Sequence, residues 1–367
     1  SISAEAYSRV TENIGVAIVT TGPGATNAIT GVAGAWIESV PLMIISGQVK
    51  TSDLKGNSGV RQMGPQEVDI VSIVKSITKY ATTVKDPKKI RSELEKAYQL
   101  ATTGRKGPVW VDIPLDIQAA PIEPAKLLGF KKLSDKKLSD KFFNKYDEII
   151  TLINSSKRPI ILAGHGIRLS KASKDFTKMC RILKIPVVTT WNAMDLLPNS
   201  SKLNIGKPGV VALRAPNFAI QNSDLLISIG ARLDNVVTAY NPQNFAKNAK
   251  KVIVDIDLNE LNKFKMKIDF RINLDAKLFI KNLNEKTIKN KINNFSDWVN
   301  RCNDWKNRYT INDGGKFTQS KEISHLQLVD TLSDHLPKNS LIVTGSSGLA
   351  IESFYMAFRN KPGQRIF

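Results

Sequence analysis

The sequence predicts an α/β protein of three doubly wound parallel-sheet blocks, of which the first and third are incomplete. Three observations predict this class. Short runs rich in Val and Ile recur along the 367 residues, as in strands buried on both faces of a parallel sheet. Several of these runs end in glycine-containing turns that precede helical patterns. The composition is 42% hydrophobic and 23% charged, an ordinary globular mix that excludes wholesale disorder.

The first block covers residues 1–125 and alternates strand and helix patterns. The expected strands are short apolar runs, at Gly15–Thr20, Pro41–Ser46 and Pro108–Pro114. The expected helices are Ser3–Glu12, Ala25–Ile37 and a segment from Ile90 to Gly104, where apolar residues recur at helical spacing. A Lys-rich linker, 126–147, is expected to follow.

The second block, 148–285, repeats the pattern. Its expected strands are Pro159–Ala163, Ile185–Thr190, Leu225–Gly230 and Lys251–Asp257, and Leu169–Leu183 is expected to be helical. A polar joining segment, 286–322, continues a helical stretch predicted over Lys281–Arg308.

The third block, 323–367, has few elements. It is expected to hold a helix at Leu326–Leu336, a strand at Ser340–Thr344, a helix at Leu349–Phe358 and the start of a strand near Phe367. Because a domain of about 100 residues or more needs more chain, and because the sequence begins at Ser1, we expect the chain to be cut at both ends.

The charge balance is basic, with a formal net charge of +20 and a pI near 9.8. Much of the excess lies in Lys- and Asn-rich stretches, and no zinc finger, helix-turn-helix or RNP-type motif accompanies it. We therefore expect no nucleic-acid partner, although the field favours anionic ligands. No apolar run of about 20 residues and no signal peptide is visible, so we expect no membrane association. Two cysteines, Cys180 and Cys302, fit a reducing cytoplasm.

Four glycine- or acid-containing turns follow predicted strands. Thr20–Asn27 (TTGPGATN) offers small residues and backbone N–H groups to a ligand, although a tight turn without a ligand has the same pattern. Gly164-His165-Gly166 suits a phosphate, with the imidazole itself more typical of a structural residue. Asp255 and Asp257 suit a ligand hydroxyl or a helix N-cap equally. The Gly345–Gly348 turn is a weak signal, and it is not a nucleophile elbow.

These turns, in this order, resemble those of thiamine-diphosphate-dependent enzymes of the acetolactate synthase group. The most specific stretches are TTGPGATNAITGVAGAWIESVPLMIISGQV, QEVDIVSIVKSITKYA, GRKGPVWVDIPLDIQ, RPIILAGHG, SDLLISIGARLDN and KVIVDID. The resemblance implies a pyrimidine-binding domain, a central domain that holds FAD in some members, and the start of a diphosphate-binding domain. It implies decarboxylation of a 2-keto acid, with pyruvate the expected donor, and carboligation to a second carbonyl.

The resemblance also implies cofactors and partners. These are thiamine diphosphate with Mg²⁺, FAD in some members, a homodimer or homotetramer, and a possible regulatory subunit. It assigns Gln66 as the active-site glutamine and Pro23, Asn27, Ser347 and Gly348 to thiamine diphosphate. For FAD it assigns Arg105, Gly209, Asp255, Asp257 and Asp275. It places the catalytic glutamate before Ser1 and the metal motif beyond Phe367, so we expect the chain as written to be inactive.

Three positions depart from the family pattern. Pro65 stands where the family has Phe, Leu115 where it has Lys, and Lys207-Pro208 where it has Met-His. An apolar residue in place of a cation changes how an anionic keto acid is held. Two alternatives therefore stay open: a carboligase acting on a modified sugar or another acceptor, and a non-catalytic paralogue or fragment.

Overall fold

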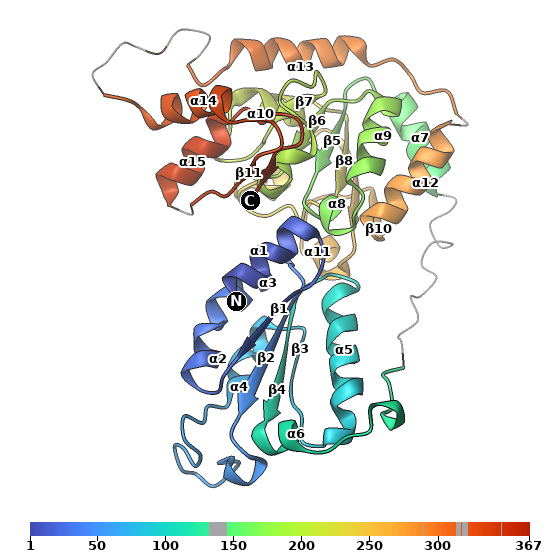
Figure 1. Cartoon of the computed structure of the whole chain (residues 1–367). Coiled ribbons are helices and arrows are strands. Elements are labelled where there is room, and N and C mark those ends of the chain that lie inside the picture. The colour runs from blue at the N-terminus through green and yellow to red at the C-terminus, as the bar shows by residue number, and fades with distance from the viewer. Residues whose placement is uncertain (132–144, 289, 313–316, 318–321, 346) are drawn as a thin grey trace. The chain divides into compact units, whose positions relative to one another are not determined.

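The computed structural model describes residues 1–131, 145–288, 290–312, 317, 322–345 and 347–367 (Figure 1). The chain divides into two compact units, Ser1–Lys136 and Lys137–Phe367. Most of the predicted linker lies outside the described residues. Every strand pairing is parallel, so the predicted α/β class with parallel sheets is confirmed.

The first unit contains a four-stranded sheet in the order β1-β2-β4-β3. Its strands are β1 (Gly15–Val19), β2 (Leu42–Gln48), β3 (Tyr80–Thr83) and β4 (Pro108–Pro114). Val19 pairs with Ser46, and Ser46 pairs with Asp112. Three strands therefore end side by side, and the turns that follow them share one edge of the sheet.

Helices cover both faces of this sheet. They are α1 (Ile2–Thr11), α2 (Pro23–Asn27), α3 (Ile29–Glu38), α4 (Ile70–Val74), α5 (Ile90–Thr102) and α6 (Leu115–Ala119). Side chains alternate along β2, because successive residues of a strand point to opposite faces. Leu42 and Ile44 pack in the core beneath α3 and α4, and Met43 packs with Ala97 of α5 on the other face.

Two features of the first unit differ from the sequence expectation. The helix expected over Ala25–Ile37 is two helices, α2 and α3, separated at Ala28, whose N–H donates to Ala25 O as in a tighter turn. Strand β3 was not anticipated. It is a short edge strand whose four residues are all half-buried, so it lacks the apolar run of a central strand.

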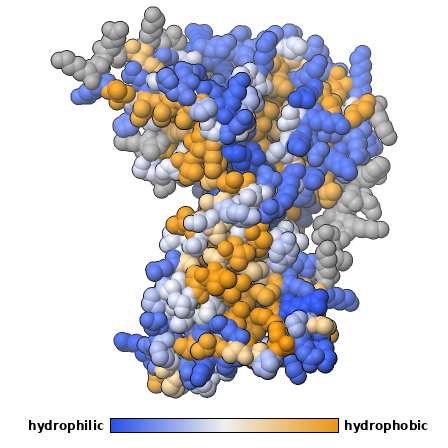
Figure 2. Space-filling model, viewed as in Figure 1, coloured by the Kyte–Doolittle hydropathy of each residue, from blue (hydrophilic) through white to orange (hydrophobic). Residues whose placement is uncertain are grey.

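The first unit also leaves part of its sheet uncovered. Val16 and Ile18 lie on the same face of the edge strand β1 and are 50% and 78% exposed. Figure 2 shows hydrophobic residues gathered in the region where Figure 1 draws β1. Contiguous exposed apolar surface of this kind is typical of an interaction surface.

The second unit is organised around a six-stranded sheet in the order β10-β9-β8-β5-β6-β7. Its strands are β5 (Pro159–Ala163), β6 (Val187–Thr189), β7 (Asn204–Gly206), β8 (Leu225–Ile229), β9 (Lys250–Asp255) and β10 (Phe270–Asn273). Strand β5 comes first in this sheet. Strands β6 and β7 lie on one side of it, and strands β8, β9 and β10 follow on the other side. This is the strand order of dinucleotide-binding folds, with its switch point between β5 and β8.

Seven helices flank the described part of this sheet. They are α7 (Lys145–Ser155), α8 (Gly166–Leu169), α9 (Ser173–Leu183), α10 (Arg214–Gln221), α11 (Leu258–Asn262), α12 (Ala276–Ile288) and α13 (Ser296–Arg308). One core joins the sheet to α7, α9 and α12, and the other joins it to α10, α11 and α13. Trp298 and Cys302 bring α13, from the predicted joining segment, into the second core.

Two helices of this unit are shorter than expected. The helix expected over Leu169–Leu183 is two helices, α8 and α9, because the chain turns at Lys171, which has a φ of 57°. The stretch expected over Lys281–Arg308 is likewise divided between α12 and α13. Helix α12 buries Phe279, Ile280 and Leu283 and is not merely a solvated polar helix.

The end of the chain adds two helices and a two-stranded parallel sheet to the second unit. They are α14 (His325–His335), β11 (Leu341–Ile342), α15 (Gly348–Ala357) and β12 (Arg365–Ile366). Trp191 stacks on Tyr355 with ring centroids 4.6 Å apart. The fully buried Asp195 carboxylate pairs with both Arg168 and Arg365. These contacts tie the last elements to the central sheet.

Candidate cofactor-binding sites

The turn after β1 carries two of the predicted cofactor residues. Gly22 precedes α2 with a φ of 56°, a left-handed conformation that glycine adopts without strain. Pro23 and Asn27 begin and end α2, and both are exposed. Because residues four apart lie on the same side of a helix, an apolar and an amide side chain are presented together.

The structure brings this turn against the loop that contains Gln66. A Cβ placed on Gly22 would lie 2.2 Å from the Gln66 carbonyl oxygen, so only glycine permits the approach. Gln66 has a φ of 60° and is exposed. The buried Glu67 carboxylate holds the loop by accepting hydrogen bonds from the N–H groups of Lys55, Met63 and Gly64. Gly22 and Gln66, 44 positions apart in the chain, thus meet at one place.

A buried polar network lies at the same edge of the sheet. The Asp112 carboxylate accepts hydrogen bonds from Ser46 Oγ (2.5 Å), Gln48 Nε2 (3.1 Å) and Thr83 Oγ1 (3.3 Å). Thr21 Oγ1 of the turn donates to Gln48 Oε1 at 2.9 Å. Burial raises the pKa of Asp112 above its ordinary value, and the hydrogen bonds oppose this rise. The network fixes the turn after β1 to β2 and β4.

The sequence pattern predicted the strand Pro108–Pro114, which contains Asp112, but it did not single out this residue. The available signal was a carboxyl residue inside the apolar run of Pro108–Pro114, since carboxyl groups are rarely fully buried without partners. Its partners on β2 and β3 become neighbours only through strand pairing.

In the second unit, the glycine turns after β5 and β8 contact each other at the switch point. A Cβ on Gly164 would lie 2.0 Å from the Gly230 carbonyl oxygen, and one on Gly166 would lie 2.8 Å from Gly230 Cα. The His165 ring nitrogen Nδ1 lies 2.8 Å from Asn192 O, which supports the structural interpretation of this imidazole. Crevices at such switch points are where ligands bind in open α/β sheets.

The predicted acidic residues lie at the ends of the next two strands. Asp257 caps α11 by accepting from Asn259 N–H at 2.9 Å, and Asp255 accepts from Asp257 N–H at 2.9 Å. Asp275 accepts from Lys277 N–H at 2.8 Å where α12 begins. The N-cap alternative is therefore observed for Asp257. A carboxylate accepts several hydrogen bonds, so the ligand role of these acids stays a prediction.

The remaining predicted residues are more scattered. Gly209 has a φ of 130°, and its N–H and C=O both bind the Asn217 amide; its neighbour Val210 donates to Val236 O beyond β8. Arg105 lies in the first unit, where its Nε donates to Ser39 Oγ. Ser347 and Gly348 begin α15. Their roles also stay predictions.

Within the described ranges, no group of three or more His, Cys, Asp or Glu side chains could hold a metal ion. None of the helices that the structure describes is long and apolar enough to cross a membrane.

Both units match models of one protein family. Residues 1–73 match the N-terminal TPP-binding domain of thiamine pyrophosphate enzymes, and residues 146–283 match their central domain. The chain belongs to the thiamine pyrophosphate enzyme family, as the resemblance implied.

Within this family, the chain is similar to curated proteins named acetolactate synthases. The acetolactate synthase large subunit of Lactococcus lactis is 33% identical over 96% of this chain and 59% of its own length. That of Corynebacterium glutamicum is 36% identical over 84% of this chain and 48% of its own length. The mitochondrial acetolactate synthase of Schizosaccharomyces pombe is 31% identical over 94% of this chain. The chain thus spans roughly half to three fifths of the length of these relatives.

Proposed function

We propose that the protein is a thiamine-diphosphate- and Mg²⁺-dependent carboligase that decarboxylates pyruvate and joins the two-carbon fragment to a second carbonyl, as an acetolactate synthase does. The observation that carries this proposal is the meeting of the Gly22 turn with the Gln66 loop. The family match and the relatives' names support it.

The residues present at this turn fit a planar ring that needs hydrogen bonds. Pro23 offers an apolar surface, Asn27 an amide on the same side of α2, and Gln66 a second amide from the adjoining loop. We assign Pro23 and Asn27 to thiamine diphosphate and Gln66 as the active-site glutamine beside it. Ser347 and Gly348 are assigned to the diphosphate of the cofactor. When bound, thiamine diphosphate supplies the electron sink for decarboxylation. The Thr21–Gln48–Asp112 network would hold the turn in place for it.

FAD is the further cofactor that we propose. The Rossmann-type strand order and the close glycine contact between the turns after β5 and β8 support a dinucleotide crevice. Gly209 and the acids Asp255, Asp257 and Asp275 would line it. We also assign Arg105 to FAD, as the family resemblance implies. We expect the purified protein to show flavin absorbance, and heat denaturation to release the flavin. Protein that neither carries nor takes up FAD would contradict the assignment.

We also propose a homodimer or homotetramer, with a regulatory subunit as a further partner. The exposed Val16 and Ile18 face of β1 supports pairing with a protein surface, and two relatives are named as large subunits. The cytoplasm is the proposed location, because Cys180 and Cys302 are both buried free thiols.

The reaction is tested with the protein expressed from its whole reading frame. Pyruvate is supplied with thiamine diphosphate and Mg²⁺, and carbon dioxide and acetolactate are measured. We expect the two products in equal amounts. Carbon dioxide released only when another carbonyl is added would favour the alternative acceptor, which Pro65 and Leu115 motivate. No binding of thiamine diphosphate in calorimetry would overturn the proposal and favour a non-catalytic paralogue.

The role of Gln66 is tested by Gln66→Ala, with Gln62→Ala in the same loop as the matched control. Loss of a positioned amide should lower acetolactate formation about tenfold or more, equivalent to about 1.4 kcal/mol. The Gln62 side chain is exposed and donates a hydrogen bond to the Gly64 carbonyl, so its variant should stay within about twofold of the wild type. Equal effects of the two variants would assign the loss to the loop and not to Gln66.

A further inference from the structure

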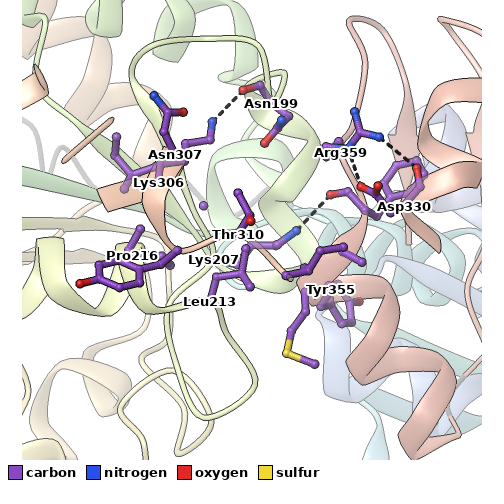
Figure 3. Close-up of a pocket in the computed structure, with 18 of the residues that line it drawn as sticks. Asn199, Lys207, Leu213, Pro216, Lys306, Asn307, Thr310, Asp330, Tyr355 and Arg359 are labelled. Atoms are coloured by element: carbon purple, nitrogen blue, oxygen red, sulfur yellow. Dashed lines mark hydrogen bonds and ion pairs between the residues drawn. The ribbon is translucent and has the colours of Figure 1, made fainter. Parts of the chain in front are cut away.

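A pocket of roughly 330 Å³ lies within the second unit, in the size range of small-molecule sites (Figure 3). The loop between β7 and α10, the end of α13 and the helices α14 and α15 all contribute to its wall. It is separate from the glycine turns after β5 and β8, none of which lines it.

Two lysines from different elements face this pocket. Lys207 belongs to the Lys-Pro-Gly segment that departs from the family pattern, and its Nζ lies 3.4 Å from Phe358 O. Lys306 of α13 donates to Asn199 O at 2.8 Å and to Asn204 O at 2.7 Å. Figure 3 shows Lys207 and Lys306 on neighbouring parts of the pocket wall.

Carbonyl dipoles are the only hydrogen-bond acceptors of these two amines within the described part of the chain. The Asp330 carboxylate that also lines the pocket binds Arg359 Nε at 2.7 Å. Burial lowers the pKa of Lys207 to about 7, with repulsion from Lys306 as a second cause, and burial lowers the pKa of Lys306 to about 8. Within the described residues, no carboxylate accepts a hydrogen bond from either amine, so the two positive charges have no compensating anion there.

The rest of the wall is largely apolar. The side chains that contribute are Ile205, Leu213, Pro216, Ile311, Tyr355 and Met356. A purely inorganic anion would leave this surface in contact with water, whereas an organic body would bury it.

We propose that this pocket binds a small organic anion, a carboxylate or a phosphate on a compact apolar body, with Lys207 and Lys306 holding the charged group. The site contains none of the residues assigned to thiamine diphosphate, so its test does not depend on the proposed reaction. Lys207 is the lysine of the Lys-Pro-Gly segment, which differs from the family pattern, and it brings a positive charge to the pocket wall.

The proposal is tested by calorimetric titration of the chain with benzoate, phenyl phosphate, benzamide and inorganic phosphate. We expect benzoate or phenyl phosphate to bind, whichever charged group the pair of lysines prefers, and to bind at least tenfold more tightly than inorganic phosphate. Benzamide has the same ring without the charge and should not bind. Benzamide binding as tightly as benzoate, or no binding of either organic anion, would overturn the proposal.

Variants locate the site. Lys207→Met should weaken binding at least tenfold, and Lys207→Arg should keep most of it, because the positive charge remains. Lys202→Met, an exposed lysine outside the pocket, is the control of equal charge change and should bind like the wild type. Unchanged binding by Lys207→Met would refute the assignment. Thermal melting of each variant separates lost binding from lost folding.

The pH dependence gives a second readout. The titratable groups that line the pocket are Lys207, Lys306, Tyr309, Asp330, Tyr355 and Arg359. Because the anion binds the protonated amines, its affinity should fall as the pH rises from 7 to 9. Lys207→Arg, which keeps its charge, should show a smaller fall. An affinity independent of pH in the wild type would count against the lysine pair.

Discussion

Two buried aspartates, Asp112 and Asp195, are stabilised by different kinds of partner. Asp195 faces two arginines, and the N–H of Ile366 also donates to it at 3.2 Å. Asp112 is surrounded by neutral donors only, and its pKa is raised by burial. Removal of the two carboxylates should therefore have different consequences for stability.

The Asp112→Asn variant tests the raised pKa. Between the unfolded value of 3.8 and the higher folded value, the folded protein binds more protons, so the stability that Asp112 contributes falls as the pH rises. The advantage of the wild type over Asp112→Asn should shrink from pH 4 upward. At neutral pH the variant still costs about 1–3 kcal/mol, because an amide cannot accept all three hydrogen bonds. Chemical denaturation at several pH values measures both effects, and a growing advantage would contradict the sign.

The Asp195→Ala variant should cost about 3–5 kcal/mol, because it leaves two arginines without their buried carboxylate. Asp334→Ala is the matched control. Its carboxylate is 64% exposed, and its partner Arg359 keeps Asp330, so we expect a loss of at most about 1 kcal/mol. Denaturant unfolding compares the two, and similar losses would show that the Asp195 pairs are not the cause.

At this scale the sequence indicated some residues and missed others. Gly22, Gln66 and Asp257 belong to motifs that can be recognised within a few consecutive residues. Lys207 and Lys306 are 99 positions apart, and each alone resembles a surface lysine. Only the packing of α13 beside β7 brings them to one pocket.

The glycines in the turns between strands and helices adopt backbone angles that other residues rarely adopt. Gly22 combines a positive φ with contact to the Gln66 carbonyl, whereas Gly56 has a φ of 48° with nothing near its Cβ position. These two glycines therefore separate backbone strain from close approach.

Gly22→Ala should lower both the melting temperature and the affinity for thiamine diphosphate, because its Cβ forces the Gln66 loop away. Gly56→Ala carries only the cost of a positive φ, about 1–2 kcal/mol, and should leave cofactor affinity unchanged. Thermal melting and calorimetric titration of the whole-frame protein make the comparison. Equal cofactor affinity in the two variants would show that the Gly22 contact is not needed for binding.

Elements were predicted well where they follow from local chemistry. The strands at Pro108–Pro114 and Pro159–Ala163 have the predicted bounds, because short, mainly apolar runs end there at a proline or at a glycine turn. The break at Lys171 was not predictable, since a lysine rarely adopts a left-handed backbone. Strand β3 forms by pairing with β4, and this pairing cannot be predicted from the local sequence pattern.

The molecule consists of two units with separate cores. The first has two core clusters, one on each face of its sheet, and the second has three. No core cluster of the described residues crosses the division at 136/137. Each unit therefore has the buried apolar surface that cooperative unfolding requires.

Scanning calorimetry of the chain should accordingly resolve two transitions. Asp112→Ala should lower the melting temperature of one, and Asp195→Ala that of the other, because each carboxylate lies in a different unit. A single transition shifted by both variants would show that the units unfold together.

The arginine pair around Asp195 also limits how the protein can be recombined. Arg168 and Asp195 come from the central sheet region, while Arg365 comes from the last strand, 170 positions later. A chimaera that exchanges the segment after residue 323 with that of a relative must import a cation at position 365. Otherwise the graft removes the ion pair of Asp195 Oδ2 at the junction and leaves Arg168 as the one arginine partner of this carboxylate among the described residues. For protein engineers, position 365 is therefore part of the central sheet's design and not a freely exchangeable terminus.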